Sequence, residues 1–193
     1  MIAITFQVIE MIKVYKPISE QAQATKDNMV ADHRAWIGVI GATIDQPAID
    51  KPIHARVTYN NTGRQPAPTY LRFSPVVFPI DEWNNGKAFS ALNDVRDKCF
   101  SVEDVTGPPN ITAFPTAAGG GYTYDATFTD ANGNSMVKVD QDVVSGHKVV
   151  ALIGCMVYRS YDVVRHTSYC GFDLVGKNVS TNLGYCVAGN DAN

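Results

Sequence analysis

The chain has 193 residues, of which 45% are hydrophobic and 18% are charged. A chain of this length buries about 70% of its unfolded surface, which is enough for one domain with a sizeable core. Sixteen basic and nineteen acidic residues give a net charge of −3, and the sequence contains no basic block and no RNA-binding signature. The composition therefore indicates a globular, β-rich protein and argues against nucleic-acid binding.

Residues 1–33 are predicted to form a helical segment that acts as an anchor or as a stalk. Residues 1–15 are mostly apolar, but two charged side chains interrupt them. They are also fewer than the roughly twenty apolar residues that span a bilayer. Residues 18–33 are rich in Ala, Gln, Glu and Lys, which favours a solvated helix. Pro17 is expected to kink or restart this helix, because proline lacks a backbone donor.

From Arg34 onwards the pattern changes to short strands separated by turns. Residues 53–59 alternate between apolar and polar side chains, which is typical of a half-buried strand. Residues 70–80 also have β character, and Pro75 and Pro79 favour an edge strand or a bend there. Further strands are expected at residues 35–44, 111–114, 122–128, 136–139, 148–161 and 164–174.

One internal helix is predicted at residues 87–99, where apolar side chains recur at helical spacing. The remaining signals are strands and turns, so residues 34–193 are expected to form a single β-sandwich domain. The predicted fold is mainly β. It is an immunoglobulin-like antiparallel β-sandwich with an N-terminal α-helix and one short internal helix.

The chain contains four cysteines: Cys99, Cys155, Cys170 and Cys186. None of them has C-x-x-C spacing, so a zinc ribbon or a thioredoxin-type motif is not expected. If Asp162 and Val163 form a two-residue turn, Cys155 and Cys170 lie opposite each other on paired strands, near disulfide range. A bridge between Cys170 and Cys186 competes with this pairing, and buried free thiols are the third alternative. A disulfide at any of these cysteines would indicate an oxidising compartment.

A calcium loop begins with oxygen ligands at alternate positions, as Asp130, Asn132 and Asn134 provide. The twelfth position holds Gln141 where such a loop needs Glu, and Asn-Gly is a strong hairpin signal, so we interpret these residues as a hairpin. No G-x-S-x-G motif is present, and the four histidines do not have the spacing of metal ligands. The sequence therefore predicts no catalytic residue, no cofactor and no metal site, and we expect the protein not to be an enzyme.

Three segments together resemble an uncharacterised family of bacterial envelope-associated proteins. They are residues 31–39 (ADHRAWIGV), 57–67 (VTYNNTGRQPA) and 157–170 (VYRSYDVVRHTSYC). Members of that family place a helix or transmembrane segment before an immunoglobulin-like sandwich. The resemblance implies this architecture for roughly residues 20–175, and it carries no activity.

These observations favour a non-catalytic interaction or structural module of the bacterial cell envelope, either membrane-associated or periplasmic. A protein partner or self-association is expected, together with membrane association through the N-terminal helix. The first alternative is a pilin-like filament or assembly subunit, because residues 6–10 (FQVIE) match the Phe-x-x-x-Glu opening of type IV pilins. The second alternative is a metal-dependent enzyme that uses the residues around Asp130.

Overall fold

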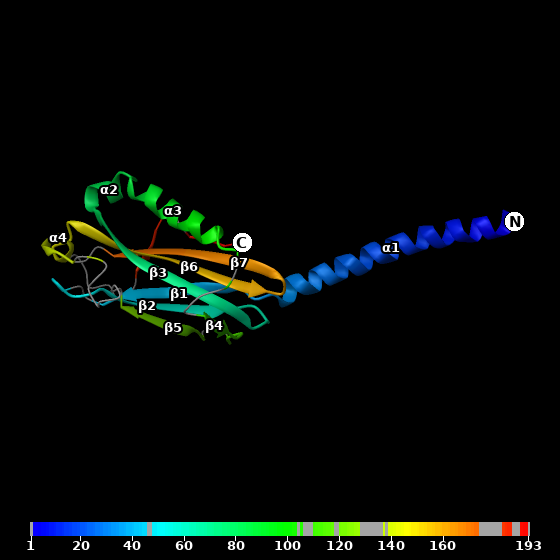
Figure 1. Ribbon diagram of the computed structural model, residues 1–193, viewed down its shortest axis with the longest axis horizontal. Helices are drawn as coiled ribbons and strands as arrows, with labels where there is room; N and C mark the ends of the chain where they lie inside the picture. Colours follow the sequence, from blue (N-terminus) through cyan, green and yellow to red (C-terminus); the bar gives the residue numbers. More distant parts are fainter. Residues whose placement is uncertain are drawn as a thin grey trace. The chain divides into compact units, whose positions relative to one another are not determined.

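The fold is described from a computed structural model (Figure 1). It describes residues 2–45, 48–103, 105, 110–117, 120–127, 137, 139–173, 183–186 and 190–192. Only the backbone is described for residues 2–14, 110, 126 and 127. The chain divides into two compact units, Met1–Arg34 and Ala35–Asn193.

The first unit is helix α1 (Ile2–His33), which contains Pro17 in its interior. The predicted kink or restart at Pro17 does not divide α1, which is one continuous helix. Proline removes one backbone donor, and the hydrogen bonds on either side of it maintain the helix. None of the helices in the described part of the chain combines the length and hydropathy that a membrane span requires.

The second unit is mainly β, as predicted, and its two sheets are entirely antiparallel. One sheet has the order β1-β2-β5. Its strands are β1 (Ile37–Ile44), β2 (His54–Asn61) and β5 (Tyr122–Thr127). The other has the order β4-β3-β6-β7-β8, with β9 also paired to β7. Its strands are β4 (Asn110–Ala113), β3 (Ala67–Pro79), β6 (Lys148–Ser160), β7 (Val163–Asp173), β8 (Gly184–Tyr185) and β9 (Asp191–Ala192).

The second unit also contains three described helices where the sequence predicted one. Helix α3 (Ala88–Phe100) agrees with the prediction for residues 87–99. Helices α2 (Ile80–Asn84) and α4 (Gln141–Val144) were not predicted, because four or five residues are too few to show a helical period.

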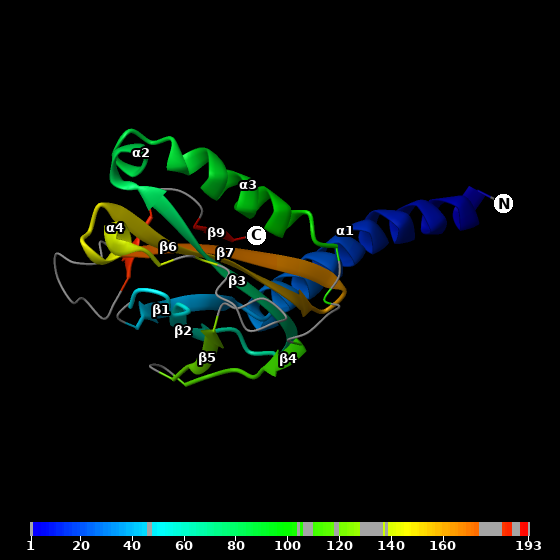
Figure 2. The ribbon, with the colours of Figure 1, turned by 60° about the vertical axis from the view of Figure 1, so that its left-hand side comes forward.

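Strand β6 is buried on both faces, so it lies in the middle of three layers. Its even-numbered side chains belong to the core between the two sheets: Val150, Leu152, Met156 and Tyr158. Its odd-numbered side chains pack with residues of α3 or of the C-terminal segment: Ala151, Ile153, Cys155 and Val157. Figure 2 shows α3 on one side of the β3-β6-β7 sheet and β1 and β2 on the other. We call the side of this sheet that carries α3 the outer face.

An aromatic cluster fills the core between the sheets where β6 has no side chain. Phe73 lies directly opposite Gly154, and a Cβ added at Gly154 would come within 1.8 Å of the Phe73 ring. The ring centroid of Phe73 is 6.1 Å from that of Tyr124 and 6.4 Å from that of Tyr169. Gly154 is therefore required by the close approach of an aromatic ring.

A buried amide, Asn61, holds three segments of the second unit together. Its Oδ1 accepts hydrogen bonds from the backbone N–H groups of Trp36 (3.1 Å) and Gly63 (3.0 Å). Its Nδ2 donates to the backbone carbonyls of Gln65 (2.6 Å) and Ala113 (3.0 Å). The side chain is fully buried, and all of its donors and both acceptor lone pairs are used.

The second half of β3 forms an edge of its sheet within the described residues. Strand β4 pairs only with the first residues of β3, from Ala67 to Tyr70, whereas β6 pairs with β3 as far as Pro79. The prolines at positions 75 and 79 therefore lie where no second described strand pairs. This position agrees with the edge strand that the prolines predicted.

Candidate functional site

Two disulfides join other segments to the outer face of the β3-β6-β7 sheet. Cys99 of α3 is bonded to Cys155 of β6, with 5.6 Å between their Cα atoms. Cys170 of β7 is bonded to Cys186, which follows β8, with 5.4 Å between their Cα atoms. No cysteine of the chain is free. Each bond therefore fastens a separate covering segment to a central strand.

The structure contains the Cys170–Cys186 bridge and not the Cys155–Cys170 bridge that the sequence left open. The two central residues of the β6–β7 turn are Tyr161 and Asp162, one residue earlier than predicted. This change moves the register, so Cys155 lies opposite Ser168 and not opposite Cys170. The sequence also assigned no partner to Cys99, because the packing of a helix on a sheet is not visible in a strand pattern.

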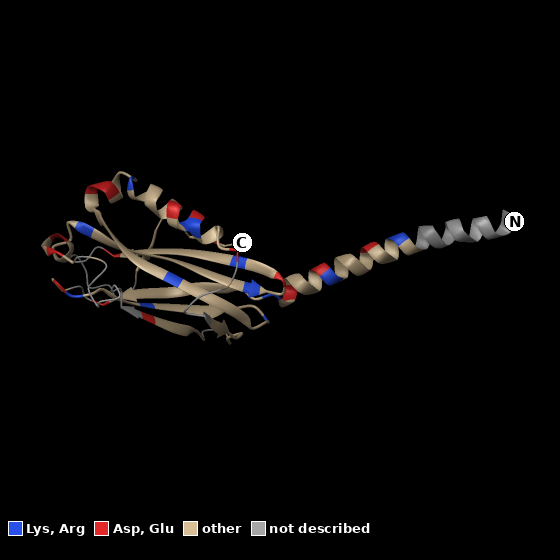
Figure 3. Cartoon of the chain, viewed as in Figure 1, with Lys and Arg blue, Asp and Glu red and all other residues tan. Residues whose placement is uncertain are grey.

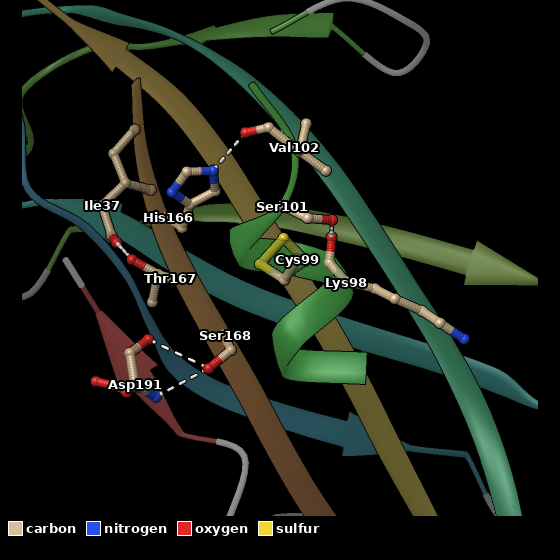
Figure 4. Close-up of a disulfide and its surroundings, with 10 residues drawn as sticks. Ile37, Lys98, Cys99, Ser101, Val102, His166, Thr167, Ser168 and Asp191 are labelled. Carbon is tan, nitrogen blue, oxygen red and sulfur yellow. Dashed lines mark hydrogen bonds between the residues drawn. A yellow bond between two sulfur atoms is a disulfide. The ribbon is translucent and has the colours of Figure 1, made fainter. Parts of the chain in front are cut away.

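His166 secures the end of α3 next to the first disulfide (Figure 4). Its Nε2 lies 2.6 Å from the carbonyl oxygen of Val102, and its ring centroid is 5.4 Å from that of Phe100. The side chain is buried. His166 lies within the strand that was expected at residues 164–174, but its contact with the segment after α3 depends on tertiary packing.

The C-terminal segment is attached to β7 by backbone contacts as well as by the second disulfide. The N–H of Cys186 donates to the carbonyl of Cys170 at 3.1 Å. The side chain of Asn190 accepts from the N–H of Cys170 at 2.8 Å and donates to the carbonyl of Cys186 at 3.1 Å. Ser168 and Asp191 continue these contacts along β7 and β9 (Figure 4).

Ser145, His147 and Asp142 lie close together but do not have the geometry of a catalytic triad. Ser145 Oγ is 3.0 Å from His147 Nδ1, and Asp142 Oδ1 is 3.8 Å from the same nitrogen. A triad requires the hydroxyl and the carboxylate on different ring nitrogens. The side chains of His147 and Asp142 are also 74% and 57% exposed. These contacts describe a local turn after α4.

An ion pair borders a shallow groove along the edge of β3. Lys148 Nζ lies 2.5 Å from Asp140 Oδ2, and Asp140 also accepts from the backbone N–H of Val143, which caps α4. The hydrogen bond from Lys148 is the main reason that the pKa of Asp140 is lowered, and the same bond raises the pKa of Lys148. The groove has a volume of about 580 Å³, and it is lined by Pro75, Val76, Val77, Pro79, Val137, Asp140 and Lys148. Lys148 also lies 3.5 Å from Asp142 Oδ2, so the charged side chains at this end of the groove are paired with one another.

Three tyrosines of the core between the two sheets are packing residues that stay protonated at neutral pH. Burial raises the pKa of Tyr59 to about 12, and it also raises the pKa of Tyr124 and of Tyr169.

Among the described residues, no three His, Cys, Asp or Glu side chains come together as metal ligands. The calcium-like residues Asp130, Asn132 and Asn134 lie outside the described residues. Basic and acidic residues are both distributed over the described part of the second unit (Figure 3).

Three large apolar side chains are exposed at one end of the second unit, and we call them the turn patch. Trp36 is 41% exposed, Tyr161 is 42% exposed and Val163 is 47% exposed. The N–H of Ala35 donates to Ser160 Oγ at 2.9 Å, which brings the residue before Trp36 beside the residue before Tyr161. These three exposed apolar side chains are candidates for contact with another molecule.

Comparisons with protein-family models, with curated proteins and with solved structures found no match to this chain.

Proposed function

We propose that this chain is a non-catalytic interaction module of the bacterial cell envelope. The pair of disulfides on the outer face carries the proposal, because such bonds persist in oxidising compartments and are rare in the cytosol. The turn patch supplies an exposed apolar surface for a protein partner. The resemblance of residues 31–39, 57–67 and 157–170 to an envelope-associated family points to the same location.

We also infer that the two sheets form an immunoglobulin-like sandwich with an added layer. Support comes from the antiparallel pairing of both sheets and from the core cluster to which both contribute. Helix α3 covers the outer face of the second sheet, which lies open to solvent in a simple two-layer sandwich. The disulfides then compensate for the small contact area of a single helix and a short C-terminal segment.

Thiol counting on the protein isolated from the envelope fraction of its source cell tests the compartment. We expect no thiol to react with an alkylating reagent in denaturant before reduction, and all four cysteines to react after reduction. Four reactive thiols without reduction would contradict an oxidising location. Turnover of generic ester, phosphate or glycoside substrates at enzyme-like rates, unaffected by further purification, would contradict the non-catalytic role.

A pilin-like filament or assembly subunit is the second candidate. The 32-residue helix α1 directly precedes a β-rich unit in the chain, and residues 6–10 of α1 match the opening of type IV pilins. Electron microscopy of the concentrated full-length protein tests this candidate. Regular filaments would support it, and a field of dispersed particles would contradict it.

A further inference from the structure

The large apolar side chains that are exposed between residues 15 and 33 of α1 lie on one side of the helix. They are Tyr15, Ile18 and Met29, which are 73%, 58% and 59% exposed. With Ala22 and Thr25 between them, they follow one another at alternating spacings of three and four residues. This is the heptad spacing of a coiled-coil seam. We call these five residues the α1 seam.

The two side-chain polar pairs described in α1 lie on the opposite side of the helix. Lys16 and Glu20 form an ion pair at 4.0 Å, and Gln23 donates to Asp27 at 2.8 Å. At about 100° per residue these four positions are centred roughly 150° away from the α1 seam. The helix is therefore two-sided, with its stabilising polar pairs facing away from its exposed apolar residues.

The one polar side chain of the α1 seam is already satisfied by its own helix. Thr25 Oγ1 donates to the carbonyl of Gln21 at 2.8 Å, so covering it leaves no unpaired hydroxyl hydrogen. Pro17 lies outside the α1 seam and does not interrupt it. Earlier in the sequence, Met11, Val8 and Ile4 continue the same alternating spacing.

We propose that α1 associates with α1 of a second copy of this chain in a parallel coiled coil. A heptad repeat averages 3.5 residues per turn, and its apolar side chains pack along a second helix that has the same repeat. Of the flanking positions Ser19, Gln21, Lys26 and Asn28, only Lys26 is charged. Parallel copies place Gln21 against Lys26 of the partner, so the flanking positions bring no like charges together. The next position of the repeat is Asp32, and the α1 seam therefore ends at Met29. The inference rests on the proposed interaction role and names the partner as the same chain.

Two alanine positions provide a matched test of the α1 seam. Ala22 lies on it and Ala24 lies outside it, and both are exposed on the same helix. Sedimentation velocity on the full chain, from low micromolar concentration to about 100 µM, should show concentration-dependent association. Ala22→Lys should weaken the association about tenfold or more, because it buries a charge in the seam, and Ala24→Lys should change it less than about twofold. Both variants should keep the disulfide-bonded second unit folded, as near-UV circular dichroism can confirm.

Three outcomes would overturn the inference. The wild-type chain could remain monomeric throughout the concentration range, or both lysine variants could weaken association equally. It could also remain monomeric in solution and sediment with vesicles of phosphatidylethanolamine and phosphatidylglycerol, which would assign the apolar residues of α1 to a membrane surface. The proposed function would be contradicted by substrate turnover or by thiols that react without reduction. None of the three outcomes involves either result, so a failure of this inference can be told apart from a failure of the proposed function.

Discussion

Replacing Asn61 by aspartate tests whether the buried amide holds the second unit together. The substitution keeps the shape of the side chain and removes the Nδ2 donor. The carbonyls of Gln65 and Ala113, now 2.6 Å and 3.0 Å from Nδ2, would then face an acceptor. Each buried carbonyl left without a donor costs about 1–3 kcal/mol, so we expect Asn61→Asp to lower the free energy of unfolding by about 4 kcal/mol at pH 7.

The stability that Asn61→Asp loses should depend on pH. The direction of this dependence follows from the two carbonyls of Gln65 and Ala113. They favour the protonated carboxyl, which can still donate one hydrogen bond, so the pKa of the introduced carboxyl group is raised in the folded state. A group whose pKa is raised by folding contributes stability below its unfolded pKa, which is about 3.9 for an aspartate side chain, and loses that contribution as the pH rises. The difference between the variant and the wild type should therefore shrink by about half when the pH is lowered from 7 to about 4.

Urea unfolding followed by tryptophan fluorescence measures both effects, with the wild type as the reference at each pH. Asn60→Asp is the matched control, because Asn60 is the preceding residue on β2 and is only partly buried. We expect the control to change the free energy of unfolding by less than about 1 kcal/mol. Equal losses for the two variants, or a loss at Asn61 that does not vary with pH, would refute the assigned hydrogen bonds.

Three further predictions concern a close contact, a turn and the two disulfides of the second unit. Gly154→Ala should cost about 3 kcal/mol because its Cβ would overlap the Phe73 ring, whereas Gly38→Ala, which meets nothing within 4 Å, should be neutral in the same urea titration. Tyr161→Gly should raise the unfolding midpoint, with a gain of about 0.5–1 kcal/mol, because Tyr161 has a φ of 54°; a lower midpoint would contradict the left-handed turn. Replacing both cysteines of the Cys99–Cys155 bridge by serine should lower the free energy of unfolding by about 4 kcal/mol. The same replacement at Cys170 and Cys186 should lower it by about 3 kcal/mol, because the loop is shorter, with a sequence separation of 16 and not 56. Thermal unfolding that ranks the two bridges in the opposite order would count against this loop-closure argument.

Local patterns predicted the longer strands, because each of them alternates or forms one apolar run. The two-residue strands β8 and β9 were not predicted. Of the strand expected at residues 136–139, residues 137 and 139 are not in a strand, and the other two lie outside the described residues. Strand β2 was expected at residues 53–59 and is observed at His54–Asn61, and its alternation matches its buried residues. The position of α3 followed from the helical spacing of its apolar side chains. Both predictions depend on the burial of one face of the element, and the spacing of apolar residues in a single sequence shows that face.

The layer on the outer face could not be predicted because its evidence is spread over distant residues. The sequence predicted a strand at residues 148–161, but the apolar run within it did not show what covers each face of that strand. The pairing of Cys99 depended on that missing layer. The pairing of Cys170 depended on the exact turn, since moving a two-residue turn by one position moves every opposed pair.

The half-paired edge of β3 affects how copies of this protein can meet. An open strand edge invites another strand to add to the sheet, and repeated addition leads to aggregation. Pro75 and Pro79 have no N–H to offer, so a strand that approached beyond Tyr70 would find too few donors to complete a ladder. The second half of β3 therefore discourages the addition of a strand along this edge, even where many copies are crowded together.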